Sequence, residues 1–234
     1  MAVHRQPREE RATPRRQRKV ARAQNISRMC LVCGRDNEFG LHARFYELAP
    51  EDTPTPGAPS SAAAAGGSSA AGPELLGIFD VREEHQSYPG RLHGGISSTI
   101  LDETIGRAIL LVEPDVWGVT VEFMARFRKP VPLDGEVRCV ARVTRDSSRV
   151  FEGTGEILLA DGSVAVQGSG RYLKRSLGGI TDARFLEREW FTDRREKPES
   201  VDLRDRVGGP GRPAPLPHHR TCGSASGGSS GRCS

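Results

Sequence analysis

Residues 95–112 are the part of the chain that most restricts how it can fold. Their sequence, GISSTILDETIGRAILLV, has the length and period of a helix, and Pro114 cannot continue it. Placed at about 100° per residue, the apolar side chains cover an arc of about 180°. A helix with this much apolar surface must be buried, so the rest of the chain has to supply a surface that surrounds it.

Six segments around this helix are predicted to be β-strands. In the four that follow the helix, apolar and other residues alternate with the period of a half-buried strand. Residues 146–148 and 161–163 lie between these runs as hairpin turns. The order predicts an α+β fold in which one meandering antiparallel sheet wraps around a central helix. The predicted strands are residues 39–48, 75–81, 119–127, 137–143, 151–157 and 164–172.

Three segments of the 234-residue chain are predicted to lie outside this fold. Residues 1–29 contain nine Lys/Arg and only two acidic residues, which is typical of a basic disordered tail. Residues 50–73 are a low-complexity Pro/Ala/Gly/Ser insert. Residues 178–234 read as a mostly disordered extension, with one short amphipathic helix as its candidate element. The folded domain is therefore expected at 30–177.

Charge and hydropathy exclude several classes of function. The predicted domain holds fifteen Lys/Arg against twenty Asp/Glu, so a nucleic-acid groove has no support there. No run of 18 apolar residues exists, so we expect no membrane span. We expect a cytoplasmic protein; the Arg-rich start leaves a mitochondrial one as the alternative, against which Glu9-Glu10 and the prolines argue. Residues 1–29 alone remain a candidate module for anionic partners.

The five cysteines do not form a disulfide framework, because their number is odd and they are widely spread. We expect reduced thiols. Cys30-x-x-Cys33 has half of a zinc-like spacing, but a structural zinc normally takes four protein ligands and no second pair follows. Only His42 and His85 offer themselves as further ligands. We therefore predict no metal, and interpret the pair as packing or a tight turn.

Two neighbouring acids on the predicted helix receive different interpretations. Asp102 falls at the border of the apolar arc, where burial raises the pKa of a carboxyl group and functional acids tend to lie. Its residue pattern alone leaves a functional acid and a satisfied structural acid equally open. Glu103 lies on the far side, four residues before Arg107, as in a solvated ion pair.

His93-Gly94-Gly95 begins the helix. The first N–H groups of a helix lack an intrahelical acceptor, and the helix dipole adds positive potential there. Such a site can stabilise a developing oxyanion. The alternative is a tight loop that needs only the conformational freedom of glycine.

Four separated motifs follow one another along the chain: CLVCGRDNEFGL at 30–41, GRLHGGISSTILDETIG, GVTVEFMARFRKPVPL and the late GRYLKR. Together they resemble the hotdog-fold acyl-CoA thioesterases of the PaaI/THEM4-like group. The resemblance covers residues 30–175 but neither tail, nor the insert. It implies hydrolysis of acyl-CoA to a free acid and CoA, without a cofactor.

The resemblance also implies roles for individual residues. Asp102 would be the nucleophile or the general base that activates water, and Thr120 would assist it. Gly95, in the motif that begins with His93, would polarise the thioester carbonyl through its N–H. Three arginines would contact the coenzyme, because guanidinium suits phosphate in geometry and charge; for each, a solvated strand residue is the alternative. They are Arg126, Arg128 and Arg149.

One position departs from the family pattern. Many relatives place an amide side chain six residues before the His, where this chain has Ser87 with Gln86 beside it. Which loop side chain supports the carbonyl is therefore open.

The spacing of the two proposed groups predicts an assembly. Gly95 and Asp102 are seven residues apart, about 10 Å along a helix. A general base must lie within about 3 Å of the atom that it serves. One helix therefore cannot offer both groups to one thioester, and a two-fold homodimer with two shared sites is the simplest solution. Assembly of two dimers into a tetramer stays open.

Two other functions are alternatives within the same fold. A non-catalytic acyl-CoA binding or regulatory protein would bind ligand without releasing a thiol. A hotdog hydratase usually needs an Asp/His pair in one site, and the lack of a second His near the helix argues against it.

Overall fold

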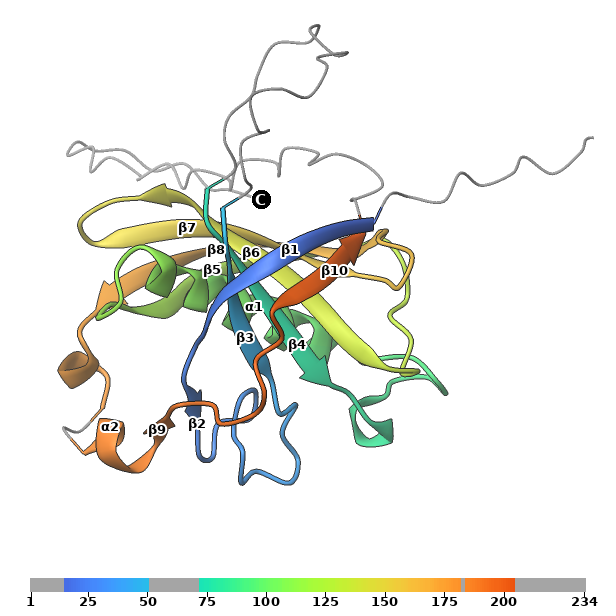
Figure 1. The fold of residues 1–234 in the computed structure, drawn as a ribbon, viewed down its shortest axis with the longest axis horizontal. Coiled ribbons are helices and arrows are strands. Elements are labelled where there is room, and N and C mark those ends of the chain that lie inside the picture. Colours follow the sequence, from blue (N-terminus) through green and yellow to red (C-terminus); the bar gives the residue numbers. More distant parts are fainter. Residues whose placement is uncertain (1–14, 51–71, 182–183, 205–234) are drawn as a thin grey trace, which may run out of the picture.

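The computed structural model describes residues 15–50, 72–181 and 184–204 (Figure 1). Helix α1 is Gly94–Arg107, extended by a 3₁₀ turn at Ala108–Leu111, and helix α2 is Phe185–Arg188. The predicted helix is thus confirmed, with its last turn in a tighter form. The strands are β1 Arg15–Ala23, β2 Ile26–Ser27, β3 Arg44–Leu48, β4 Glu74–Asp80, β5 Trp117–Phe127, β6 Glu136–Asp146, β7 Val150–Leu158, β8 Val164–Arg175, β9 Trp190–Phe191 and β10 Ser200–Arg204.

One large antiparallel sheet forms the body of the molecule. Its strand order is β10-β1-β3-β4-β6-β7-β8-β5, and β2 pairs separately with β9. The six predicted strands correspond to β3 to β8. The prediction of a simple meander is wrong, however, because β5 pairs with β8 at the far edge of the sheet and not with β6. Helix α1 carries the chain from β4 across the sheet, so β5 cannot join beside β4.

Helix α1 packs on the concave face of this sheet, in contact with β4 to β8 (Figure 1). Ile100, Leu101 and Ile105 on its apolar side are fully buried in the main core. Glycines in the strands below allow the close approach. A Cβ on Gly153 would stand 2.6 Å from the Ile105 side chain, nearer than real Cβ contacts allow. The fold is therefore the α+β wrap that the sequence predicted.

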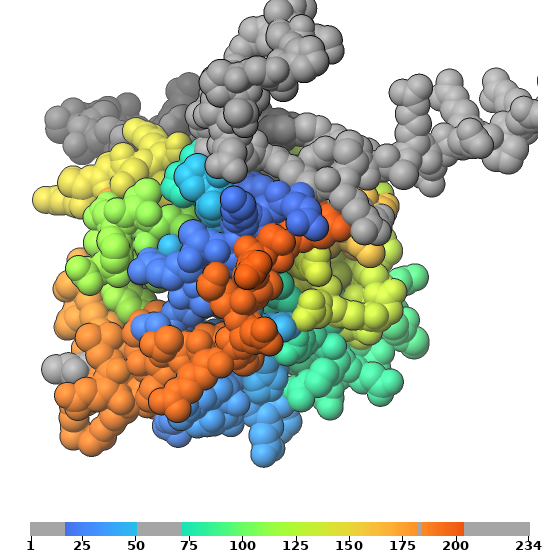
Figure 2. Space-filling model, in the orientation of Figure 1, coloured from blue at the N-terminus to red at the C-terminus, as the bar shows by residue number. Residues whose placement is uncertain are grey.

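The first and last described strands cover the opposite face of the sheet. β1 pairs with β10 and with β3, and Figure 2 shows these two chain segments side by side on the surface. Val20, Val201 and Leu203 are buried there in a second core with side chains of β3, β4 and β6. The predictions of disorder are thus wrong for residues 15–29 and for most of 184–204. The apolar residues of these segments are too widely spaced for a strand pattern to be recognised in the sequence. They are buried because they pack against side chains of β3, β4 and β6.

A buried charge network also holds β1 in place. Arg18 of β1 pairs with Glu74 of β4 at 2.9 Å, and Arg142 of β6 joins Glu74 to Glu156 of β7. Pairing of this kind is required wherever charges are taken out of water. Part of the basic character of the N-terminal segment thus belongs to the fold.

The predicted amphipathic helix near residue 185 is shorter than expected. Only α2 is helical, and the chain then forms β9. Residues 1–14 and 205–234, which were predicted to be disordered, lie outside the described residues. So do residues 51–71, which make up most of the low-complexity insert. Within the described part, no helix combines the length and apolar character needed to cross a bilayer.

Candidate active site

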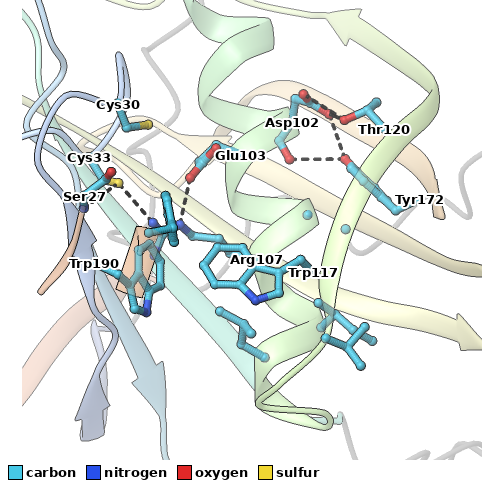
Figure 3. Close-up of a pocket in the computed structure, with 16 residues that line it drawn as sticks. Ser27, Cys30, Cys33, Asp102, Glu103, Arg107, Trp117, Thr120, Tyr172 and Trp190 are labelled. Carbon is cyan, nitrogen blue, oxygen red and sulfur yellow. Dashed lines mark hydrogen bonds and ion pairs between the residues drawn. The ribbon is translucent and has the colours of Figure 1, made fainter. Parts of the chain in front are cut away.

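Asp102 lies at the centre of a small hydrogen-bond group on α1 (Figure 3). The Thr120 hydroxyl contacts its two carboxylate oxygens at 3.0 and 3.2 Å. The Tyr172 hydroxyl lies 3.1 Å from Asp102 Oδ1 and 3.2 Å from the Asp102 backbone carbonyl oxygen. Two hydroxyl groups from two strands thus orient one helical carboxylate.

The pairing of β5 with β8 brings the two hydroxyls together. Thr120 and Tyr172 are cross-strand partners, so their side chains leave the sheet on the same face, toward α1. A register shift between Thr120 and Glu122 leaves Val121 as an extra residue. Such a bulge at a sheet edge re-aims the neighbouring side chain. The alternation of β5 did not by itself say that Thr120 reaches Asp102.

The environment of Asp102 raises the pKa of its carboxyl group above the ordinary value. Desolvation by burial is the main cause, and the hydrogen bonds from Thr120 and Tyr172 oppose it, while the charge of Glu103 adds a small increase. Burial raises the pKa of the Tyr172 hydroxyl, and the Asp102 charge raises it further. Tyr172 therefore stays a hydrogen-bond donor at neutral pH.

A pocket of about 290 Å³ opens beside Asp102. Thr120 and Tyr172 also line it, next to the carboxylate. Its far end is aromatic, with Trp117 packed edge-on against residues of the C-terminal segment at centroid distances of 4.7 and 5.7 Å. These partners are Trp190 and Phe185. One end of the pocket is therefore apolar, and the Asp102 carboxyl group, whose pKa is raised, lies at its side.

The helix start lies apart from Asp102. His93 is the N-cap residue of α1, and its Nδ1 accepts a hydrogen bond from the Gly95 N–H at 2.9 Å. Both residues are exposed. The structure thus brings Asp102 together with Thr120, and His93 together with Gly95, but it does not bring these two pairs together within one chain.

The predicted coenzyme-binding arginines lie at two ends of the sheet. Arg126 and Arg128 are exposed at the end of β5, where Arg128 contacts Gln167 at 2.9 Å. Arg149 is exposed in the β6–β7 turn, beside the residues that pair with the start of β5. A single chain does not gather the three arginines.

The loop before the helix has no direct contact with the Asp102 group. Ser87 is exposed, and its backbone N–H bonds to the carbonyl of Arg91. The Gln86 side chain faces the N–H of Gly90, within its own loop. Both residues at this departure from the family pattern therefore bond within their own loop.

The prediction of a solvated Glu103–Arg107 pair is wrong in one respect. The ion pair forms at 2.8 Å, but Arg107 is only 8% exposed. Its guanidinium stacks over the rings of Phe45 and Trp190 and contacts the Cys33 sulfur at 3.0 Å. The face of α1 expected in water is thus covered partly by Cys33 and Phe45 of the predicted domain. The two terminal segments that were expected to lack structure cover the rest, through the Asn25 carbonyl and the Trp190 ring.

Cys30 and Cys33 both line the same pocket. Among the described residues they form, with Glu103, a group whose ligand atoms lie within 4.8 Å of one another. His42 and His85 are not part of it; His85 instead caps a short turn through the N–H of Arg82. The absence of a metal remains a prediction.

Tyr172 is the residue that the sequence did not single out as functional. It ends the predicted strand 164–172 and lies in the GRYLKR motif, but no pattern linked it to Asp102. Only the position of β5 at the edge beside β8 makes the contact. Trp190 and Phe185 belong to the C-terminal segment, for which only a short amphipathic helix was predicted.

Comparison with known proteins agrees with this architecture. Residues 89–166 match the thioesterase superfamily. These residues contain helix α1, strands β5 to β7 and the start of β8, and the antiparallel sheet wrapped around α1 is a hotdog fold.

Particular relatives can be compared over part of the chain. Human acyl-coenzyme A thioesterase 13 is 29% identical over 101 residues, which are 43% of this chain and 72% of that protein. A conserved protein of Pseudomonas aeruginosa is 27% identical, with a TM-score of 0.41 over 44% of this chain and 81% of its own. Zebrafish thioesterase superfamily member 2 is 23% identical, with a TM-score of 0.40 over 43% and 73% of the two chains.

Proposed function

We propose that this protein hydrolyses acyl-CoA thioesters to a free acid and CoA. The observation that carries the proposal is the half-buried Asp102 carboxylate, oriented by two hydroxyls beside a largely apolar pocket, within a thioesterase superfamily domain. The human relative, which is named an acyl-coenzyme A thioesterase, supports the choice of substrate.

In this mechanism Asp102 either removes a proton from the water that attacks the thioester carbonyl, or attacks that carbonyl itself to form an anhydride that water then hydrolyses. In both routes the C–S bond breaks and CoA leaves as the thiol. The bonds from Thr120 and Tyr172 hold its oxygens in place, so little reorganisation is needed on the way to the transition state. Burial raises its pKa, which makes the carboxylate a stronger base than one in water. A Gly95 N–H, released from His93, would stabilise the oxyanion.

We further propose that the active unit is a homodimer formed through β5. This strand is an edge of the sheet, and long apolar edges tend to pair. Among its exposed side chains, Val121 and Phe127 are 62% and 54% accessible. β5 also runs past both halves of the site: Thr120 contacts Asp102, and the Phe127 ring lies beside Gly94, 3.5 Å from where a Cβ would stand.

Antiparallel pairing of β5 with its copy follows from this layout. A two-fold axis near the middle of the strand would set Thr120 of one subunit near Phe127 of the other. The helix start of the partner would then approach Asp102. Both groups could reach one thioester, although Gly95 and Asp102 of the same chain lie about 10 Å apart. The same pairing would bring the partner's Arg126 and Arg128 toward the end of the sheet that carries Arg149, where they could meet the CoA phosphates.

The first test compares two adjacent acids. Asp102→Asn should reduce the kcat for thiol release from a panel of acyl-CoA esters by about 10²–10⁴-fold, the usual contribution of a general base. Glu103→Gln, its neighbour on α1, should retain most of the activity. Unchanged turnover in Asp102→Asn would remove the assignment. Saturable acyl-CoA binding by the wild type without thiol release would favour the non-catalytic alternative.

The second test concerns the shared site. Val121→Lys should yield monomers by light scattering, with turnover lost although the thermal unfolding stays cooperative. A mixture of Asp102→Asn chains with Gly95→Pro chains, each inactive alone, should regain about a quarter of wild-type activity after subunit exchange, since one site of each heterodimer is intact. An active monomer would contradict the dimer proposal.

A further inference from the structure

The wall of the pocket opposite Thr120 and Tyr172 carries a pair of thiols that the proposed hydrolysis does not use. Cys30 and Cys33 belong to one tight turn, closed by a bond of 2.8 Å from the Gly34 N–H to the Cys30 carbonyl. Any side chain at position 34 would stand 2.2 Å from that carbonyl oxygen, so the turn requires glycine. Figure 3 shows both thiols near Glu103 and Arg107.

Several donors converge on the two sulfur atoms. The backbone N–H of Ser27 and the Arg107 guanidinium contact the Cys33 sulfur at 3.3 and 3.0 Å. The N–H of Val32 lies 3.3 Å from the Cys30 sulfur. Thiolates are stabilised by such N–H groups and cations. The pair is therefore built to hold a negative charge on sulfur.

The two thiols differ in exposure and in acidity. The hydrogen bond with Cys33 lowers the pKa of Cys30 to about 6, against the opposing effects of burial and of the Glu103 charge. The same bond and burial raise the pKa of Cys33. Cys30 is partly exposed to the pocket, whereas Cys33 is buried. The pair can therefore share one negative charge, and Cys30 is the sulfur that a reagent in the pocket can reach.

A divalent cation fits this cluster less well than a redox reaction does. The only clustered ligands among the described residues are the two sulfurs and Glu103, one fewer than a structural zinc normally takes. The Arg107 guanidinium already contacts both Cys33 and Glu103 at 3.0 and 2.8 Å. A second positive charge at the same place would be repelled, and Arg107 cannot lose its proton.

We propose that Cys30 and Cys33 form a reversible oxidation site, in which a peroxide converts the two thiols to an intramolecular disulfide. The i to i+3 spacing in a turn keeps the two Cα atoms within about 7 Å, the range that a disulfide spans. The sulfur atoms already lie within 4.8 Å of each other. This proposal does not depend on the thioesterase activity.

The reaction balances with one peroxide per pair. The Cys30 thiolate attacks one peroxide oxygen, the O–O bond breaks, and hydroxide leaves and takes up a proton to become water. Cys30 is then a sulfenic acid. The Cys33 sulfur attacks the Cys30 sulfur, the S–O bond breaks, and a second water leaves with the Cys33 proton. The two thiols lose two electrons and the peroxide gains them.

The test uses the full chain with Cys222→Ser and Cys233→Ser, so that Cys30, Cys33 and Cys139 are the three remaining thiols. The reduced protein receives one equivalent of hydrogen peroxide. Free thiols should fall from three to one per chain, the intact mass should drop by two hydrogens, and a peptide with linked Cys30 and Cys33 should be found. Dithiothreitol should restore all three thiols.

Two variants separate the steps. Cys33→Ser should accumulate a sulfenic acid on Cys30 that dimedone traps, and Cys139→Ser should leave the loss of two thiols unchanged. The proposal is overturned if three thiols persist, if Cys139 or a second chain supplies the disulfide partner, or if the purified protein holds one zinc per chain that protects both thiols. The thiol count is made on the chain that keeps Cys30, Cys33 and Cys139. It therefore remains decisive if Cys33→Ser or Cys139→Ser fails to fold.

Discussion

The two sides of helix α1 are governed by different parts of the chain. On one side, Asp102 meets Thr120 of β5 and Tyr172 of β8, which lie within or just beyond the segment 89–166 that matches the thioesterase superfamily. On the other, Glu103 pairs with Arg107, and Arg107 contacts Cys33, Phe45 and Trp190, all three of which lie outside that segment. Adjacent residues of one helix thus belong to two different environments.

This difference shows what determines the chemistry on each side. Asp102 stays half-buried with neutral hydroxyl partners, which leaves its charge available. Arg107 is buried against the Glu103 carboxylate, the Cys33 sulfur and two aromatic rings, so its charge is used for structure. The first arrangement suits a reaction, and the second suits stability and control of the thiols.

The largest expected effect on stability concerns the Arg107 side. Arg107→Met should lower the free energy of unfolding by about 3–5 kcal/mol, because it leaves the Glu103 charge without its buried partner. Urea unfolding under reducing conditions measures this. Arg145→Met provides the control: its pair with Glu152 is 3.9 Å long and Arg145 is 73% exposed, so a change within about 0.5 kcal/mol is expected. Equal losses of unfolding free energy in the two variants would show that the Arg107 contacts stabilise the fold no more than an exposed ion pair does.

A smaller effect is expected from Tyr172→Phe on the other side. The ring keeps its stacking on Phe151, and only the donor to Asp102 is lost. A hydrogen bond to a charged group contributes about 1.5–3 kcal/mol, so kcat should fall about 10- to 100-fold.

The pH profile tests the cause of that loss. The Tyr172 bond lowers the pKa of Asp102, so its removal raises that pKa. Asp102 acts in its ionised form, and the acidic limb of kcat/KM should therefore move to higher pH. Tyr46→Phe, in the second core, should leave this limb in place. A limb that stays fixed in Tyr172→Phe would mean that another group titrates there.

The smallest effect should come from Glu103→Gln, and it should have the opposite sign. The Glu103 charge raises the pKa of Asp102, as the weakest of the causes acting on it. Its removal should move the acidic limb slightly to lower pH while kcat stays within about twofold. A shift of the acidic limb to higher pH, or a loss of kcat as large as that of Asp102→Asn, would show that Glu103 also takes part in catalysis.

Much of the fold could be predicted because its signals are local. The apolar arc of α1 and the alternation in β5 to β8 come from neighbouring residues, and Pro114 marks the end of the helix. The contact of Asp102 with Thr120 followed from a family resemblance; the alternation of β5 had left it open. β1, β2, β9 and β10 escaped prediction because their few apolar residues become informative only against a surface formed by distant strands.

The sequence by itself determined that a helix would be wrapped by an antiparallel sheet, and that an acid would lie at the border of its apolar surface. Periodicity and burial act over a few residues, and one chain is enough to read them. The tertiary structure alone decided that Tyr172 reaches Asp102, that Arg107 is buried and that Cys30 and Cys33 face the same pocket. These contacts join residues up to 83 positions apart, such as Arg107 and Trp190, and such pairings depend on strand order and on how the chain ends pack, which no local pattern encodes.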